Sequence, residues 1–142
     1  MNEYTIQDIQ IGMRAEFEKT ITVEMEDAFR QISGDVNPLH YDDEYAKEVG
    51  GGRFSSHVTF GMLTASLYST LAGVYLPGKY SLIHSLEDLK FLKPVYAGDK
   101  LTVSGDVVDK DGQLGLIIIK AEIRNQENKC VSKAKIKVLV VK

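Results

Sequence analysis

Cysteine is almost absent from this sequence of 142 residues, in which Cys130 is the only one. No disulfide can therefore form within the chain, and we expect a reducing compartment, the cytoplasm. The opening residues, MNEYTIQDIQ, lack the basic segment followed by an apolar run that marks a signal peptide. Positive charge is not in excess either, because the formal net charge is −3. We therefore expect no broad surface for nucleic acid.

Asp, Glu, Lys and Arg are all missing between Phe54 and Gly78, a length that could cross a bilayer. The segment nevertheless contains His57 and many serine and threonine residues, and its apolar part is short. From about Gly61, apolar or small residues occupy every face of a helical pattern that ends at Pro77 and Gly78. A helix without a charged face must be surrounded by protein. We expect a long buried helix in a soluble protein and no membrane contact.

The remaining periodicities predict an antiparallel sheet around that helix. Hydrophobic residues make up 44% and charged residues 26%, as in an ordinary globular protein, so residues 1–142 are expected to form a single domain. The predicted segments are a strand over 14–21, short helices over 23–33 and 41–50, a strand over 80–93 with a bulge near Glu87, and three further strands separated by hairpins at 109–112 and 125–129. The predicted fold class is α+β.

The octet SGDVNPLH, residues 33–40, brings two titratable side chains close together in sequence. Asp35 and His40 would point to different sides of a helix and to opposite faces of a strand. Gly34 suits the left-handed conformation that ends a helix, and Pro38 disfavours regular structure before it. An irregular backbone therefore lets the pair converge. The octet by itself leaves two interpretations open, a catalytic pair or an ordinary turn.

Three blocks in this order, SGDVNPLH, FGMLTASLYSTLAG and LKFLKPVYAGDKLTVSGDV, resemble the MaoC-like dehydratases, the (R)-specific enoyl-CoA hydratases. The resemblance extends from about Gly12 to Val108. It implies a hot-dog fold and a homodimer or higher homo-oligomer. It also implies a hydro-lyase that adds water reversibly and syn to a trans-2-enoyl thioester. No separate cofactor is implied, because coenzyme A or an acyl carrier protein is part of the substrate.

The resemblance implies roles for three residues. Asp35 and His40 would hold one water, take its proton during attack on the β-carbon and return a proton to the α-carbon on the same face. The backbone N–H of Gly61, at the start of the central helix, would donate to the thioester carbonyl oxygen. Gly61 would also permit a tight turn into the helix, and the two roles are compatible.

Three further residues are expected beside the substrate. Asn37 would order the loop through its side-chain amide. Ser69 aligns with a family serine that supports the active-site carboxylate, although a small helix residue bonded to its own backbone is a comparable interpretation. Ser69 and Ala72 would line the acyl pocket, and the small side chain of Ala72 predicts tolerance of acyl chains beyond four carbons.

Two features depart from the family pattern. Phe60 precedes Gly61 where many relatives have histidine, so we expect no catalytic role at position 60. The loop between His40 and Gly61, containing GGGRFSSH, is a few residues longer than usual. His57 and His84 are expected to be a loop and a strand residue and not metal ligands, because the sequence lacks HExxH and paired Cys/His spacings.

Two other functions are compatible with this sequence. A hot-dog acyl-CoA thioesterase would share fold and substrate, but such families usually place a carboxylate on the central helix, where this chain has none. A non-catalytic acyl-thioester binding subunit would not need Asp35 and His40. The basic residues that could meet phosphates of coenzyme A, or an acidic carrier protein, are Arg53, Lys79, Lys90, Lys93 and Lys100.

Overall fold

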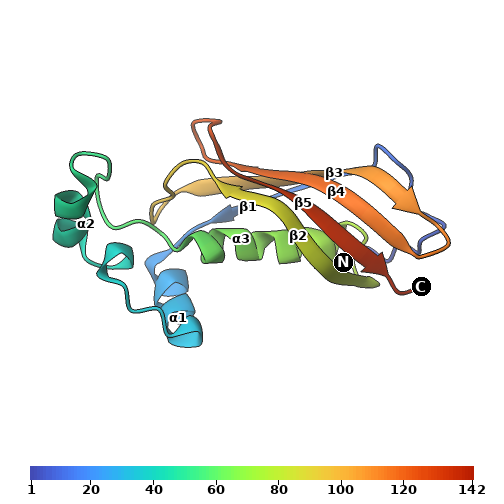
Figure 1. Cartoon of the computed structure of the whole chain (residues 1–142), viewed down its shortest axis with the longest axis horizontal. Helices are drawn as coiled ribbons and strands as arrows, with labels where there is room; N and C mark the ends of the chain where they lie inside the picture. The colour runs from blue at the N-terminus through green and yellow to red at the C-terminus, as the bar shows by residue number, and fades with distance from the viewer.

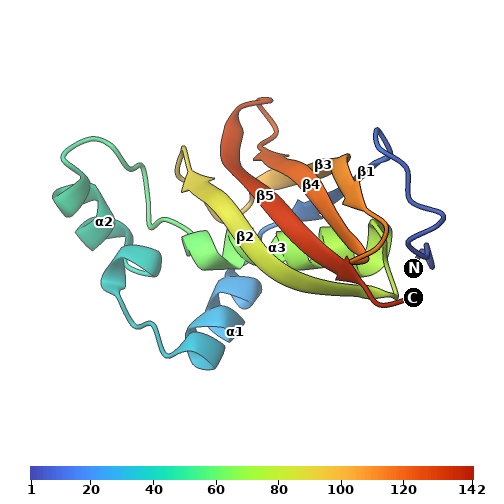
Figure 2. The same cartoon turned by 45° about the vertical axis from the view of Figure 1, so that its right-hand side comes forward.

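The computed structural model describes residues 1–142, which form a five-stranded antiparallel sheet wrapped along one helix (Figures 1 and 2). The strands lie in the order β1-β3-β4-β5-β2. Their bounds are Arg14–Thr20 (β1), Ser81–Phe91 (β2), Lys100–Asp111 (β3), Leu116–Arg124 (β4) and Cys130–Val140 (β5). The predicted α+β class and the sheet around a central helix are confirmed.

Strand β5 shows how the sequence sets the two faces of the sheet. Alternate residues from Ala134 to Val140 are buried against the helix, while Lys133 and Lys135, on either side of Ala134, are exposed. In β2 the pairing with β5 shifts between Glu87 and Lys90, which confirms the predicted bulge. A second shift in β2 lies closer to its start.

The first predicted hairpin is placed a few residues too early. Strand β3 continues through Asp111, which pairs with Leu116, and the turn lies at residues 112–115. Asp111 Oδ1 accepts the backbone N–H groups of Gln113 and Leu114 at 3.0 Å each, and Gly115 has a positive φ of 69°. Asp111 and Gly115 therefore form the turn together. The second hairpin, at 125–129, is confirmed.

The central helix α3, Gly61–Thr70, continues as a π-helical segment, η2, over Leu71–Tyr75. Its buried Tyr68 donates a hydrogen bond to Ser132 Oγ at 2.9 Å, and burial raises the pKa of Tyr68 to about 12. Leu71 packs against Gly105 of β3 so closely that a Cβ there would lie 2.8 Å from Leu71 Cδ2. None of the helices has the length and apolarity needed to cross a membrane.

A helical arm, residues 23–50, extends from one end of the sheet, opposite both termini (Figures 1 and 2). It contains α1 (Val23–Ser33), the 3₁₀ turn η1 (Pro38–His40) and α2 (Asp43–Gly50). Thr22 caps α1 by accepting the N–H of Met25, and Gly34 ends α1 with a φ of 73°, as predicted. The arm returns to the sheet at α3 and carries the octet that contains Asp35 and His40.

Candidate active site

The loop after α1 is shaped by two consecutive side-chain-to-backbone hydrogen bonds. Asp35 Oδ1 accepts the N–H of Asn37 at 3.0 Å, and Asn37 Oδ1 accepts the N–H of Leu39 at 3.0 Å. Short polar side chains commonly stabilise turns in this way. The amide oxygen of Asn37 is therefore engaged in ordering the loop, and Asp35 Oδ2 has no partner in it.

The irregular backbone brings Asp35 and His40 together. Asp35 Oδ2 lies 3.9 Å from His40 Nε2, and the two side chains are 47% and 14% exposed. This distance is too long for a direct hydrogen bond. It is short enough for one small polar molecule to contact both atoms.

The orientation of His40 is fixed by two contacts. Its Nδ1 lies 2.7 Å from the carbonyl oxygen of Val58, and because a carbonyl only accepts, Nδ1 carries the proton. In the neutral ring, Nε2 therefore presents a lone pair toward Asp35. The buried ring of Phe60 stacks on the imidazole with centroids 4.2 Å apart, so the residue at position 60 packs against His40.

His40 lines a cavity of about 310 Å³ between the start of α3 and the end of β2. The residues that line it are His40, Phe54, Val58, Thr59, Gly61, Thr64, Phe91, Leu92, Lys93, Pro94, Val95 and Val131. Half of these side chains are hydrophobic, and the polar groups are few. A mostly apolar cavity with a few polar groups suits a small organic group such as an acyl chain.

Gly61 meets this cavity at the first residue of α3. No side chain caps the helix start, and the N–H of Gly61 has no acceptor within the chain. The ring of Phe91 explains the glycine, because a Cβ at position 61 would lie 3.2 Å from Phe91 Cε1. A donor without an acceptor therefore lies on a residue that lines the same cavity as His40.

One buried hydroxyl in the cavity wall is also unpaired. Thr64, one turn into α3, is 2% exposed, and its Oγ1 has no hydrogen-bond partner. A buried polar atom without a partner costs free energy unless a ligand satisfies it. No sequence pattern indicates this role for Thr64, because a threonine inside an apolar helix is common.

Ser69 and Ala72 lie away from the cavity. Ser69 is on the exposed side of α3, and Ala72 is fully buried in the core beneath the sheet. Neither lines the cavity shared by His40 and Gly61. Their expected contact with substrate stays a prediction.

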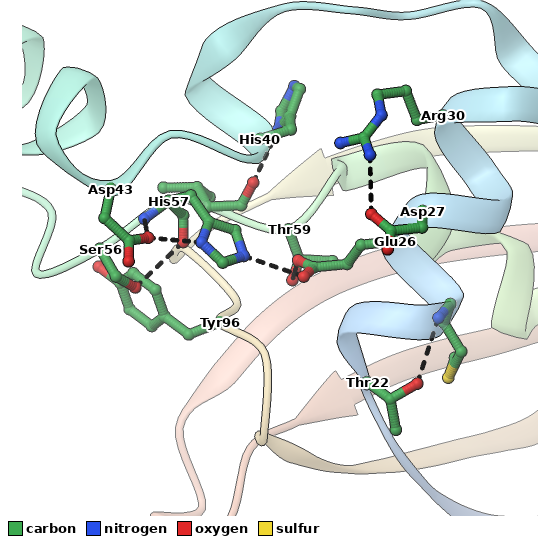
Figure 3. A network of polar contacts seen from close by, with 12 residues as sticks. Thr22, Glu26, Asp27, Arg30, His40, Asp43, Ser56, His57, Thr59 and Tyr96 are labelled. Atoms are coloured by element: carbon green, nitrogen blue, oxygen red, sulfur yellow. Dashed lines mark hydrogen bonds and ion pairs between the residues drawn. The ribbon is translucent and has the colours of Figure 1, made fainter.

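A polar network beside His40 joins His57 to three residues that no sequence pattern indicated, Glu26, Asp43 and Thr59. Glu26 of α1 is buried. Its Oε1 lies 2.9 Å from His57 Nε2, and its Oε2 accepts a hydrogen bond from the hydroxyl of Thr59 at 2.6 Å (Figure 3). The other ring nitrogen of His57 lies 2.6 Å from Asp43 Oδ1 of α2. Burial lowers the pKa of His57, but its hydrogen bonds to Glu26 and Asp43 outweigh burial and raise the pKa above 6.5. His57 is a loop residue, as expected, but a firmly held one.

Of the five candidate basic residues, only Lys93 lines the cavity. Lys79 and Lys100 form surface ion pairs, at 3.0 Å to Glu3 and 2.8 Å to Glu18. The positive charge of Lys93 is therefore the one best placed to meet an anionic group at the cavity.

The arrangement of the sheet and helix defines a hot-dog protein. The solved (R)-hydratase from A. caviae involved in PHA biosynthesis superposes with a TM-score of 0.86 at 30% identity, covering 94% of this chain and 98% of that one. The predicted hot-dog fold is therefore confirmed.

The chain belongs to the MaoC-like dehydratase family, since the family model described as MaoC like domain matches residues 7–129. An (R)-specific enoyl-CoA hydratase of Aeromonas caviae is 38% identical over 101 residues, which cover 71% of this chain and 72% of that protein. An (R)-specific enoyl-CoA hydratase of Rhodospirillum rubrum is 35% identical over 98 residues, covering 69% of this chain and 65% of that protein. The predicted family resemblance is confirmed.

Proposed function

We propose that this protein is an (R)-specific enoyl-CoA hydratase, a hydro-lyase that adds water reversibly and syn to a trans-2-enoyl thioester to give an (R)-3-hydroxyacyl thioester. The observation that carries this proposal is the convergence of Asp35 and His40 beside a cavity that holds the free N–H of Gly61. A carboxylate, an imidazole and a fixed N–H donor are the groups that this addition requires.

In the proposed mechanism one water contacts both Asp35 Oδ2 and His40 Nε2. As the water oxygen bonds to the β-carbon, its proton passes to the pair, and the pair delivers a proton to the α-carbon on the same face. The carbon–carbon double bond becomes a single bond, and the elements of one water are added. Dehydration follows the same steps in reverse. Because the two groups act together, a pH–rate profile reports on the pair.

Gly61 supplies the electrophilic assistance. Negative charge develops on the thioester oxygen as the enolate forms, and the N–H of Gly61 donates a hydrogen bond to that oxygen. Losing a donor of this kind typically costs about a hundredfold in rate. The positive end of the α3 dipole acts in the same direction.

The proposed substrate lies along the cavity, with its acyl group among the apolar side chains and its carrier outside. Lys93 is placed to meet an anionic part of the carrier, either coenzyme A or an acyl carrier protein. Contacts from Ser69 and Ala72 and tolerance of acyl chains beyond four carbons are part of the proposal. A cytoplasmic location is proposed from the single cysteine.

The first test follows the ultraviolet absorbance of crotonyl-CoA with the purified protein. We expect the conjugated absorbance to fall without release of free thiol, and the product to be the (R)-alcohol. Asp35→Asn should reduce the rate by about a hundredfold or more, since it removes a proton-transferring group. Glu44→Gln is the matched control, because Glu44 is an exposed carboxylate on the same arm.

Other outcomes would identify the alternatives. Release of free thiol would indicate a thioesterase, a function that α3 disfavours because it carries no carboxylate. Tight binding of enoyl-CoA substrates of several lengths without any turnover would indicate a binding subunit. Equal rates in the wild type and Asp35→Asn would contradict the proposed mechanism.

A further inference from the structure

A polar network lies next to His40 and has no part in the proposed proton transfers. Both ring nitrogens of His57 face carboxylate oxygens, Asp43 Oδ1 at 2.6 Å and Glu26 Oε1 at 2.9 Å (Figure 3). A ring with an acceptor at each nitrogen keeps a proton on both. We call Glu26, Asp43, His57 and Thr59 the His57 clamp.

The clamp provides hydrogen-bond partners for the carboxylate of Glu26, which would otherwise be costly to bury. Glu26 is 2% exposed, and each of its oxygens has a partner, His57 for Oε1 and the hydroxyl of Thr59 for Oε2. A buried charge that lacks partners destabilises the fold strongly. Because Glu26 lies on α1 and Asp43 is the first residue of α2, the clamp fastens both helices of the arm to the segment 57–59.

The residue between the two clamped positions is the one that orients His40. Val58 lies between His57 and Thr59, and its carbonyl oxygen accepts the proton of His40 Nδ1 at 2.7 Å. The N–H of Val58 donates to the carbonyl of Leu39 at 3.0 Å, which ties the same segment to the 3₁₀ turn. With both neighbours of Val58 fastened, its carbonyl has a fixed direction.

We propose that Glu26, Asp43 and His57 are positioning residues that hold the Val58 carbonyl, and through it keep His40 in the tautomer with a free Nε2. The inference rests on the proposed function for its catalytic consequence, but its structural content can be tested without substrate. His57 itself is not a proton acceptor in the reaction, because neither of its ring nitrogens is free. His57 and Glu26 do not line the cavity of the candidate active site.

A merely structural role for the clamp would hold the arm in place without affecting the tautomer of His40. The two roles predict different proton positions on the ring nitrogens of His40, and nitrogen-15 NMR observes these nitrogens directly. The chain contains only three histidines, so the imidazole signals can be assigned with single substitutions. Loss of hydratase activity alone would not distinguish these roles.

The experiment compares three substitutions in the full chain. Glu26→Leu removes both acceptors from the clamp. Glu26→Gln keeps an acceptor for His57 and is the conservative variant. Glu24→Leu, at an exposed position of the same helix, is the matched control. Each variant is analysed by imidazole NMR near neutral pH and by kcat and KM with crotonyl-CoA.

We expect the wild type, Glu24→Leu and Glu26→Gln to show His40 protonated on Nδ1 only. In Glu26→Leu, His40 should populate both tautomers, and kcat should fall about tenfold or more with KM unchanged, the scale known for groups that orient a metal-bound histidine. Should Glu26→Leu fail to fold, His57→Gln provides the same two measurements with Glu26 retained.

A single tautomer of His40 in a folded Glu26→Leu or His57→Gln variant would overturn the proposal, whatever the rate. Absence of hydratase activity in the wild type, with the tautomer still dependent on Glu26, would instead refute the proposed function and leave the positioning role standing. The two failures are therefore distinguishable.

Discussion

His57 links the stability of the fold to pH, because each of its ring nitrogens lies beside a carboxylate. Its pKa is raised above 6.5 despite burial, through hydrogen bonds to Glu26 and Asp43. A group whose pKa is higher in the folded chain than in the unfolded chain stabilises the fold fully at pH below its unfolded value. That contribution is lost as the pH rises through the raised pKa. The pKa of Asp43 is lowered, chiefly by the backbone N–H of His57, so its contribution is lost only in acid.

We predict that the wild type is more stable than His57→Gln at about pH 6 and that this difference shrinks as the pH rises above neutrality. Thermal melts of both proteins across this range measure it. His84→Gln, at an exposed strand position, is the control and should leave the pH dependence unchanged. A stability difference that stays constant with pH would show that the charge on His57 does not stabilise the fold.

The unpaired hydroxyl of Thr64 leads to a second prediction at this scale. Thr64→Val replaces the hydroxyl with a methyl group of similar size, and the folded protein then no longer buries an unsatisfied oxygen. We expect the free energy of unfolding to rise by about 1 kcal/mol, measured by urea denaturation. A loss of stability would mean that Thr64 Oγ1 has a partner in solution, such as water in the cavity.

The residues of the site differ in how far the sequence could predict them. Asp35 and His40 lie within one octet, and Gly34 and Pro38 predict the irregular backbone between them. Glu26 is 31 residues from its partner His57, and no local pattern connects them. Such pairs arise only once the chain is folded, so periodicity could not reveal the clamp.

At the scale of the elements, the close packing of η2 against β3 depends on Gly105. A Cβ at this position would lie 2.6 Å from Ile119 Cγ2 and 2.8 Å from Leu71 Cδ2. Both neighbours are fully buried and have no room to move. The missing side chain therefore lets the helix approach the sheet.

We predict that Gly105→Ala destabilises the fold by about 1–3 kcal/mol, the usual cost of overpacking a core. Urea denaturation followed by circular dichroism measures this change. Gly73→Ala is the matched control, because its nearest neighbour would be 3.9 Å away and alanine favours a helical backbone. Equal stability of Gly105→Ala and the wild type would mean that β3 and η2 can separate at little cost.

Elements with a strong period were predictable, and those decided by turn chemistry were less so. Strand β5 alternates buried residues with lysines from Lys133 to Val138, so its face could be assigned from sequence. The two aspartates and the glycine at 109–112 predict the turn after β3 at those residues. The left-handed residue that the turn uses is Gly115, and Asp111 remains in the strand. Several turn-forming residues in succession leave the position of a hairpin undetermined.

For the whole molecule, the two edges of the sheet differ in chemistry. The edge strand β1 carries charged side chains on its exposed positions, which discourages pairing with another chain. The edge strand β2 has polar residues at most of its exposed positions but also exposes Leu82 and Phe91, and Leu92 and Met62 nearby are also about half exposed. Exposed apolar side chains on an edge strand favour association through β2.

We predict a homodimer in solution whose interface includes β2. Sedimentation velocity should give the mass of two chains, and Leu82→Lys should shift the equilibrium toward monomer by placing a charge at the interface. Lys19→Glu, on the β1 edge, should leave the dimer intact. A wild-type monomer at micromolar concentration would contradict this prediction.

The helical arm is joined to the rest of the molecule by few contacts, chiefly the rings of Phe29 and His40 on Phe60, the His57 clamp and the two hydrogen bonds of Val58, to Leu39 and His40. Segments with so few ties open at a lower free energy than a sheet core. Amide hydrogens of α1 and α2 should therefore exchange with solvent well before those of β4 and β5. Asp35 and His40 both lie on this arm and Gly61 does not, so mild warming would separate the acid and the imidazole from the N–H of Gly61 while the sheet still retained its native hydrogen bonds.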